Sequence, residues 1–582
     1  MGKTKEIKKR TNDSRIIIMA GILAVLAGIL AFIIYKQVSL DLPGSGGMPA
    51  VTSTPEPTLE PTPEPTPEPT PEPTPFEPHS VAGTEPDKFI TGTDVEVDGE
   101  PAEDYEDDTG IIFGEGAEYT EVKGITTFRG NNFRDGASYG TANLNNKQFG
   151  EYWTVSTGSL SAPDGAVWTG SGWTGQPLIV EWPYETRQIM DMYDWAKQAE
   201  TLTEVIYPTM DGYIYFIELT SGEYTREPLY IGYSFKGTGS LDPRGYPILY
   251  LGAGYTSALG KSRVFVISLI DGSILYTFGN DDRFALRDWP MFDAAPLIDA
   301  DTDKLIYPGE NGVLYIITLN TAYDETAGTV SVDPSRVVKW RYQSNRTTVY
   351  TYWLGMEASP VIWQSHLIIP DNGGNLMCLN LNTLTLDWVQ DTLDDSNSTP
   401  VLELEDGHPY IYTSTSFHAG WRAAENATAT VPVWKIDAET GEIIWKTEYS
   451  CRTVSGVSGG VQGTIAVGKN NLSDLVFVPV ARTPAGSTGI LAALDKRTGE
   501  EVWKIETQMY SWSSPVVFYD ENGDGYIIYC TSGFYIYLLD GRTGEKLDSM
   551  NIGGNIEASP AVFENYVVVG HRAQYIYGIE MN

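Results

Sequence analysis

The chain is poor in cysteine, histidine and positive charge, and each shortage excludes a class of protein. Three cysteines in 582 residues cannot build a disulfide framework, and an odd number leaves at least one thiol free. None of the five histidines stands at ligand spacing from another histidine or from a cysteine, which argues against a zinc site. A formal net charge of -39 would repel phosphates, so nucleic acid is excluded as a partner.

Glycine and aromatic residues, by contrast, are abundant. The 59 glycines and the 12% of aromatic residues suit a β-rich globular protein with many turns. The positive charge that does exist is concentrated at one end, because residues 1–36 hold seven of the 38 lysines and arginines. The remainder of the chain is strongly acidic.

The basic end contains a long apolar run. Residues 16–35 are twenty consecutive residues without a charge, and a helix of that length spans about 30 Å, the hydrocarbon thickness of a bilayer. Six bases precede the run and only Lys36 follows closely. The positive-inside rule therefore predicts a cytoplasmic tail (1–15) and a transmembrane helix (16–35) in a bacterial cell membrane, with the rest of the chain outside. A cleaved signal peptide is the alternative, but FIIYKQVS lacks a small-x-small cleavage site.

A proline-rich stretch follows the apolar run. Residues 54–75 alternate proline with threonine and glutamate, a composition typical of an extended, semi-rigid polyproline II spacer. Residues 77–120 are acidic and show little apolar periodicity, so we expect them to be loosely ordered as well. The sequence thus predicts an extracytoplasmic linker over 36–120 and one folded domain over 121–582.

The folded domain repeats. A hairpin recurs as WKIDAETGEIIW, AALDKRTGEEVW and YLLDGRTGEKLD, with a more divergent copy in MCLNLNTLTLDW. In each clear copy an Asp caps its own turn, a Gly supplies positive φ, and a second strand follows. A small residue and a proline open an apolar strand ahead of these hairpins, at Pro296, Pro360, Pro400, Pro515 and Pro560, with weaker versions at Pro177, at Pro243 and near Gly460. Each unit supplies four antiparallel strands, so the chain is predicted to be an all-β, eight-bladed β-propeller, with seven blades as the alternative.

These units resemble the quinoprotein (PQQ-like) repeat, with its small-Pro opening, Asp-x-x-Thr-Gly turn and outer-strand Trp. TFRGNNFRDG (127–136) is similar to the Phe-Arg-Gly motif that often precedes such propellers. The resemblance implies that an N-terminal strand closes the ring, and Trp153 in EYWTVSTG would complete the last blade. Members of the family include dehydrogenases that use pyrroloquinoline quinone and calcium. Those enzymes often carry a pair of adjacent cysteines under the quinone, which this chain lacks, so the quinone is not expected here.

One ring of residues is the main candidate site. In a propeller, the residue three positions before each opening proline should line the central funnel on one face. These residues are Asp293, Glu357, Asn397, Trp512 and Glu557, with Thr174 and Ser240 in the weaker units. Three carboxylates around one axis, with no lysine or arginine among them, would hold a cation, an amine or a sugar. Alternatively, each acid hydrogen-bonds the backbone of the next blade.

A second candidate is the acidic hairpin DENGDG. Asp520, Asn522 and Asp524 match the first half of a calcium loop, but no Glu stands at its twelfth position, and a solvated polar hairpin is the alternative. The sequence contains no GxSxG, HExxH or Walker motif. We therefore expect a membrane-tethered, non-catalytic binding or scaffold propeller for an envelope protein or glycan, without a required cofactor. A quinone- and calcium-dependent dehydrogenase and a glycan-binding propeller are the alternatives.

Overall fold

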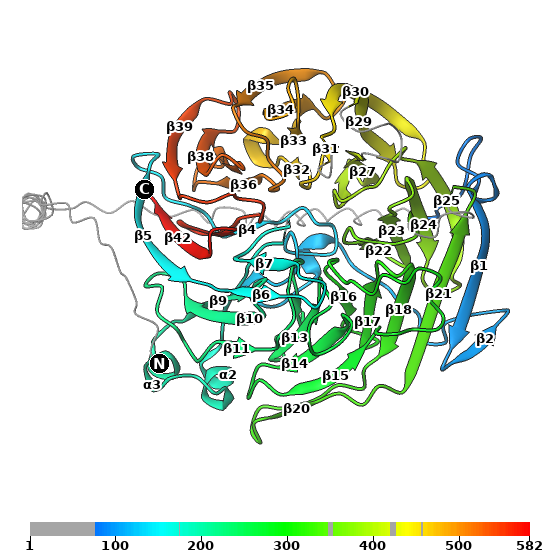
Figure 1. Cartoon of the computed structure of the whole chain (residues 1–582), viewed down its shortest axis with the longest axis horizontal. Helices are drawn as coiled ribbons and strands as arrows, with labels where there is room; N and C mark the ends of the chain where they lie inside the picture. Colours follow the sequence, from blue (N-terminus) through cyan, green and yellow to red (C-terminus); the bar gives the residue numbers. More distant parts are fainter. Residues whose placement is uncertain (1–75, 174, 347–352, 419–426, 455–457) are drawn as a thin grey trace, which may run out of the picture. The chain divides into compact units, whose positions relative to one another are not determined.

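Eight antiparallel sheets form the blades of a propeller (Figure 1). The computed structural model describes residues 76–173, 175–346, 353–418, 427–454 and 458–582. From inner to outer strand, the first three blades in these residues are β8 (Leu178–Glu181), β9 (Thr203–Pro208), β10 (Tyr213–Glu218) and β11 (Leu229–Tyr230); β12 (Ser240–Leu241), β13 (Ile248–Gly252), β14 (Val264–Ser268) and β15 (Ile274–Phe278); and β16 (Leu297–Asp299), β17 (Lys304–Pro308), β18 (Val313–Thr318) and β21 (Arg336–Ser344). The fourth, fifth and sixth blades are β22 (Val361–Trp363), β23 (His366–Pro370), β24 (Asn375–Asn380) and β25 (Thr385–Asp391); β26 (Val401–Glu405), β27 (His408–Ser414), β29 (Thr428–Asp437) and β30 (Ile443–Arg452); and β32 (Ala466–Val467), β33 (Leu475–Ala481), β34 (Gly489–Asp495) and β35 (Glu501–Thr507). The seventh and eighth blades are β36 (Val516–Tyr519), β37 (Gly525–Cys530), β38 (Tyr535–Asp540) and β39 (Lys546–Asn551); and β40 (Ala561–Phe563), β41 (Tyr566–His571), β42 (Tyr575–Met581) and β5 (Phe149–Ser156). The predicted all-β, eight-bladed propeller is confirmed.

The ring closes as the resemblance implied. The outer strand of the last blade is β5, which comes from the N-terminal side of the domain and pairs antiparallel with β42. Gly578 lies opposite Trp153 in this pairing, and the two strands lie side by side at the left of Figure 1. The prediction that Trp153 completes the last blade is therefore confirmed.

Neighbouring blades are joined by a tryptophan packed on a glycine. The Trp388 indole of the fourth blade donates its N–H to the carbonyl of Ala438 in the fifth, at 2.9 Å. A Cβ on Gly441, in the Asp-x-x-Thr-Gly turn of that fifth blade, would lie 2.6 Å from the Trp388 ring. This glycine also has φ of +71°, a region that other residues rarely adopt. The turn glycine therefore serves both the hairpin and the seam between blades.

The same seam closes the ring. Trp153 donates its indole N–H to the carbonyl of Leu219 in the first blade at 2.7 Å, and a Cβ on Gly222 would lie 2.6 Å from the Trp153 ring. Trp153 thus performs for the eighth blade what Trp388 performs for the fourth. The repeated sequence therefore specifies the same tryptophan–glycine contact between blades at both places.

The N-terminal segment of the described chain differs from the expected loose linker. It starts with Phe76 packed on Trp363 at 4.7 Å between ring centroids, continues through η1 (Pro86–Lys88), and adds β1 (Ile90–Val97) and β2 (Glu100–Ala102) to the outer edge of the third blade. Farther on, Phe113 and Tyr119 are buried beside η2 (Gly116–Glu118). Edge pairing and irregularly spaced aromatic anchors need no apolar periodicity, so this order leaves little trace in the sequence pattern.

The next segment fills the centre of the ring. After β3 (Gly124–Ile125), residues 126–137 pass across the inner strands, and β4 (Ser138–Tyr139) pairs parallel with β40 of the last blade. The Arg134 guanidinium is fully buried and donates to the carbonyls of Pro360 and Ala295 at 2.8 and 3.0 Å. Arg129 donates to the carbonyl of Pro515 at 2.7 Å. The Phe-Arg-Gly motif is therefore a plug, which binds several blades at once.

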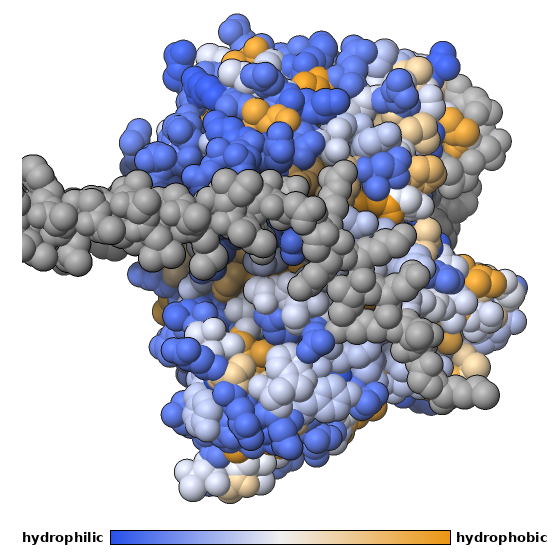
Figure 2. Space-filling view, turned by 90° about the vertical axis from the view of Figure 1, so that its left-hand side faces the viewer, coloured by the Kyte–Doolittle hydropathy of each residue, from blue (hydrophilic) through white to orange (hydrophobic). Residues whose placement is uncertain are grey.

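The remaining elements decorate this ring. They are α2 (Tyr184–Ile189) and α3 (Asp194–Gln198) within the first blade, the hairpins β6 (Ser159–Ser161) with β7 (Val167–Thr169) and β19 (Ala322–Asp324) with β20 (Thr329–Ser331), the short strands β28 (Ser416–Phe417) and β31 (Gly459–Gly460), and η4 (Asn470–Leu472). The outer rim seen in Figure 2 is mostly hydrophilic, with only scattered apolar residues.

The expected transmembrane helix (16–35) and the proline-rich stretch (54–75) lie outside the described residues. Within the part of the chain that is described, every helix is too short or too polar to cross a membrane.

Candidate functional site

A ring of hydrogen bonds identifies equivalent positions in the blades. The backbone N–H of Ala295 donates to the Ser359 hydroxyl at 2.9 Å, and the N–H of Ser359 donates to the Thr399 hydroxyl at 3.0 Å. The same bond joins Ser514 to Ser559 at 3.1 Å and Gln176 to Thr238 at 2.7 Å. The residue two positions before each of these lies at the mouth of the inner strand. These hydrogen bonds therefore identify the funnel residue of each blade that makes them, whether or not the blade opens with a proline.

The funnel contains a cavity of about 390 Å³, which is within the usual size range of small-molecule sites. Phe128 of the plug is among its lining residues. The other aromatic lining residues are Trp168, Trp173, Tyr255, Trp289, Trp353 and Trp512, and the acidic ones are Asp293, Glu310, Glu357 and Asp395. The cavity therefore combines indole surfaces with carboxylates.

Most of the predicted ring residues meet in this cavity. Asp293, Glu357, Asn397 and Trp512 all line it. Glu557 does not join the other acids, because its carboxylate accepts hydrogen bonds from Asn555 at 2.8 Å and Arg572 at 3.3 Å. Thr174 lies outside the described residues.

The prediction for the second blade was wrong. Ser240 lies on the inner strand β12, where its hydroxyl donates to the carbonyl of Pro296 at 2.8 Å and does not line the cavity. The equivalent of Asp293 is Lys236, since Thr238 occupies the hydroxyl position of the ring. The second blade opens with KGTGSL, without the proline that gave the register elsewhere. The expectation that the ring contains no lysine is therefore also wrong, because Lys236 is part of it.

Lys236 lies against three aromatic rings. Its ammonium is 4.8 Å from the ring centroid of Trp168, 4.7 Å from that of Trp173 and 5.7 Å from that of Tyr255. It also lies 3.5 Å from the carboxylate of Asp293. Attraction to the ring faces and to one carboxylate together holds this cation in the funnel wall.

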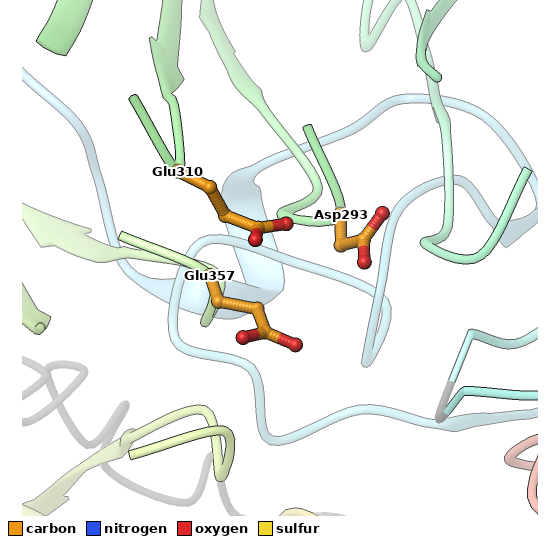
Figure 3. A group of neighbouring side chains, drawn as sticks. All are labelled: Asp293, Glu310 and Glu357. Carbon is orange, nitrogen blue, oxygen red and sulfur yellow. The ribbon is translucent and has the colours of Figure 1, made fainter. Parts of the chain in front are cut away.

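A further acid, Glu310, was missed by the sequence reasoning. It lies in the turn between β17 and β18, at the start of Glu-Asn-Gly. Carboxylate oxygens of Asp293, Glu310 and Glu357 all lie within 4.8 Å of one another, and Figure 3 shows the three side chains pointing into a common space. The turns between second and third strands share the funnel face, so the position of Glu310 in its hairpin was the available signal.

Burial of these acids raises their pKa values. The pKa of Glu357 is raised to about 7 by burial, with the charges of Asp395 and Asp293 adding to the effect. Burial also raises the pKa of Asp293, although Lys236 opposes the shift. The pKa of Glu310 lies well above its ordinary value, because it is buried and faces Glu357 and Asp293. At neutral pH the cluster therefore holds protons that exposed carboxylates would have lost.

Polar partners fix one side of each carboxylate. The indole of Trp173 donates to Glu357 at 2.9 Å, and the indole of Trp289 donates to Glu310 at 2.8 Å. Asn372 donates to Asp395 at 2.7 Å. Among the described atoms, the other oxygen of Glu310 is buried without a hydrogen-bond partner.

The other cations of the cavity are already engaged. Arg287 donates through Nη1 to the carbonyls of Glu310 and Leu354, each at 3.0 Å, and to the Asn372 side chain at 2.8 Å. His418 lies 2.9 Å from the carboxylate of Asp395. Burial lowers the pKa of His418, but this ion pair outweighs burial and raises it.

The acidic hairpin has a different construction. Asp520 accepts the backbone N–H groups of Asn522 and Asp524 at 2.9 and 3.0 Å, and Asp524 accepts the Asn471 amide at 3.0 Å. These bonds are those of a capped turn. Among the described residues, the carboxylates close enough to share a metal ion are those of the funnel, not those of this hairpin.

The residues of the funnel do not suit pyrroloquinoline quinone, the cofactor of the dehydrogenases in the family that the repeats resemble. Pyrroloquinoline quinone carries three carboxylates, so its site needs cations that are free to pair with them. Here four carboxylates line the cavity, Lys236 is paired with Asp293, and Arg287 is directed at carbonyls and an amide. The three cysteines are buried and lie far apart in the sequence. The lining would repel this cofactor.

Comparison with known proteins agrees with the repeat architecture. The family model described as outer membrane protein assembly factor BamB matches residues 324–516. The outer membrane protein assembly factor BamB of Kangiella koreensis is 26% identical over 215 residues, which is 36% of this chain and 46% of that protein. The chain thus matches less than half the length of this relative.

A structural relative covers more of the ring. The crystal structure of quinohemoprotein alcohol dehydrogenase from Comamonas testosteroni has a TM-score of 0.50 and 14% identity, and the match covers 80% of this chain and 81% of that one. At this identity the likeness concerns the fold alone. The repeats, the closed ring of eight blades in the described residues and the match over residues 324–516 show a β-propeller of the PQQ-like (BamB-type) kind.

Proposed function

We propose that this chain is a non-catalytic binding or scaffold propeller of the bacterial cell envelope. Residues 16–35 tether it to the cell membrane with the N-terminus in the cytoplasm, residues 36–75 act as a spacer, and the propeller lies outside. Its partner is an envelope protein, which it engages on the funnel face. The observation that carries the proposal is a cavity that combines indoles with carboxylates and is lined on one side by the plug.

The cavity favours binding over redox chemistry. Its cations are committed to groups of the protein, and its acids would repel an anionic quinone. Aromatic and polar side chains around an enclosed volume are the usual features of a recognition site. The family match also supports a binding function, since the matched relative is described as an assembly factor. Seven aromatic residues in the lining make a glycan the second candidate ligand.

The path of the chain leaves the funnel face accessible. The inner strand of the fourth blade runs from Glu357 at the funnel to Trp363, so Phe76, which packs on Trp363, lies at the opposite face. The N–H of His79 donates to the carbonyl of Glu439 at 2.8 Å, in the turn between β29 and β30, which shares that opposite face. The first described residues are therefore held at the face opposite the funnel.

Site-specific photo-crosslinking in intact cells tests the proposal. A photoreactive phenylalanine analogue at Phe534, which is 45% exposed in a funnel-face turn, should capture one defined envelope protein. The matched control is Ile444, which is 47% exposed beside a turn of the opposite face, and it should capture none. Equal capture at both positions, or none at either, would contradict a funnel-face partner.

Protease added outside intact cells tests the location. It should remove the propeller, because the positive-inside rule places everything after Lys36 outside. Complete protection of residues 77–582, with cleavage only after lysis, would show that the orientation is reversed.

A further inference from the structure

The funnel already holds one alkylammonium group, which belongs to the protein itself. The Lys236 side chain passes between Trp168, Trp173 and Tyr255 to reach Asp293, and it is 6% exposed. Indole faces attract an ammonium through the ring quadrupole, and the carboxylate attracts it by charge. The wall of the funnel is therefore complementary to this chemical group.

Among the described residues, two carboxylates beside Lys236 have no ion-pair partner of their own. Glu310 and Glu357 each accept one indole N–H, which does not neutralise a charge. Lys236 pairs with Asp293, and His418 pairs with Asp395. Glu310 is 4% exposed, and one of its oxygens has no hydrogen-bond partner among the described atoms. Its carboxylate lies close to those of Asp293 and Glu357 (Figure 3). Buried acceptors of this kind are normally satisfied.

The spacing of the oxygens suits an N–H₃⁺ group. The three carboxylates lie within 4.8 Å of one another, and hydrogen bonds of about 2.8 Å from one nitrogen reach acceptors that are about 4.6 to 4.8 Å apart. Beyond the acids, the wall is aromatic, with Trp173 and Trp512 edge to face at 6.1 Å. A divalent metal ion gains from oxygen ligands but little from indole faces, whereas an alkylammonium uses both.

We propose that the funnel binds the ammonium group of a ligand from outside the chain, held by Glu310 and Glu357 next to the resident ammonium of Lys236. The proposal rests on the proposed function, because it names the ligand chemistry of the same funnel. The ammonium group is carried by a free amine, a lysine side chain of a partner or an amino sugar. Binding of the cation ionises Glu357 and Glu310 fully, so protons are released and affinity rises with pH.

Calorimetric titration of the full chain tests this. The probe is n-butylamine, and n-butanol is the neutral control of the same shape. At neutral pH, n-butylamine should bind with proton release, seen as a difference between the heats in phosphate and Tris buffers, and n-butanol should not bind. Nα-acetyllysinamide and glucosamine, titrated in the same way, then distinguish a protein from a glycan source of the ammonium group.

Charge-deleting variants locate the site. Glu310→Gln and Glu357→Gln keep the shape of the side chain and should each weaken n-butylamine binding about tenfold or more, the usual effect of losing a charge-assisted hydrogen bond. Each of the two variants should also reduce the buffer dependence, because each removes one acid that releases a proton on binding. Lys236→Met should strengthen binding, because the resident cation no longer repels the ligand. The Asp520→Asn, Asp524→Asn double variant, whose acids lie in the remote hairpin, should bind as the wild type does.

Three results would overturn the proposal. They are the absence of n-butylamine binding up to millimolar concentrations, equal binding of n-butanol, and calcium binding that depends on Glu310 and Glu357 while n-butylamine does not bind. The last would make the cluster a metal site. Each leaves the photo-crosslinking result at Phe534 unaffected, so the envelope-scaffold function is tested separately.

Discussion

The contacts at the seams repeat from blade to blade, whereas the residues of the funnel differ from blade to blade. At the seams, the same pair recurs, with Trp388 on Gly441 and Trp153 on Gly222, and the same indole-to-carbonyl bond accompanies it. At the funnel, equivalent positions carry different residues, such as Lys236, Asp293 and Glu357. Repetition therefore specifies the scaffold, and departures from it specify what is bound. Substitutions at the two places should change different quantities.

The largest effect is expected at the seam that closes the ring. Trp153→Ala removes a side chain that is 5% exposed and should lower the free energy of unfolding by about 3 to 5 kcal/mol. The matched control is Trp195→Ala in α3, where the side chain is 40% exposed, with an expected change within about 0.5 kcal/mol. Denaturant unfolding measures both. Similar losses in the two variants would mean that the closing seam adds no special stability.

A seam glycine should give the next largest effect. Gly441→Ala places a Cβ 2.6 Å from the Trp388 ring at φ of +71°, and should cost about 2 to 4 kcal/mol from strain and overpacking together. Gly407→Ala is the control, because its φ is +82° but a Cβ there would meet nothing within 4 Å. It should cost only the backbone strain, about 1 kcal/mol. The difference between the two variants measures the packing of the seam.

The funnel should instead control how stability depends on pH. Glu357 loses its proton near its ordinary value of 4.5 in the unfolded chain but at about 7 in the folded chain. The folded state thus binds more protons at Glu357 between these values. The contribution of this group to stability is therefore fully present below about pH 4.5 and is lost as pH rises through about 7. Glu357→Gln should make this fall shallower in melting temperatures measured across the range. Asp387 and Glu403 titrate in the same window, so part of the slope should remain, and an unchanged slope would contradict the assignment.

The smallest effect is expected in the acidic hairpin. Asp520→Asn keeps an oxygen that can accept the backbone N–H groups of Asn522 and Asp524, so the free energy of unfolding should change by about 0.5 kcal/mol or less. The Asp520→Asn, Asp524→Asn variant should also show the same melting response to added calcium as the wild type. A calcium-dependent rise in melting temperature that this variant loses would restore the hairpin as a calcium site.

The fold was largely predictable because its signals repeat. Five small-Pro openings and the Asp-x-x-Thr-Gly turns gave the blades, and Trp153 gave the closing strand. The order of residues 76–120 was not predictable, since isolated anchors such as Phe76 and Phe113 have no period. Its strand β1 pairs along most of its length with β21, about 250 residues later in the chain.

The candidate site was predictable only where it followed the repeat. Asp293 and Glu357 were found because a proline marks their blades. Lys236 was missed because its blade opens with glycine and threonine, and Glu310 because turn residues vary freely between blades. Arg572, which pairs with Glu557 at 3.3 Å, separates that acid from the others, and only the folded chain shows which hairpin faces it.

The position of Phe76 has a mechanical consequence. Tension applied to the chain ahead of residue 76 first loads the contact of Phe76 with Trp363 and the bond from His79 to Glu439. It next reaches β1, which lies along the third blade and is paired over most of its length with β21. The closing strand β5 comes only after this clamp and the plug. A pull on the chain ahead of residue 76 would therefore detach the N-terminal segment before it strained the closing contact of the ring.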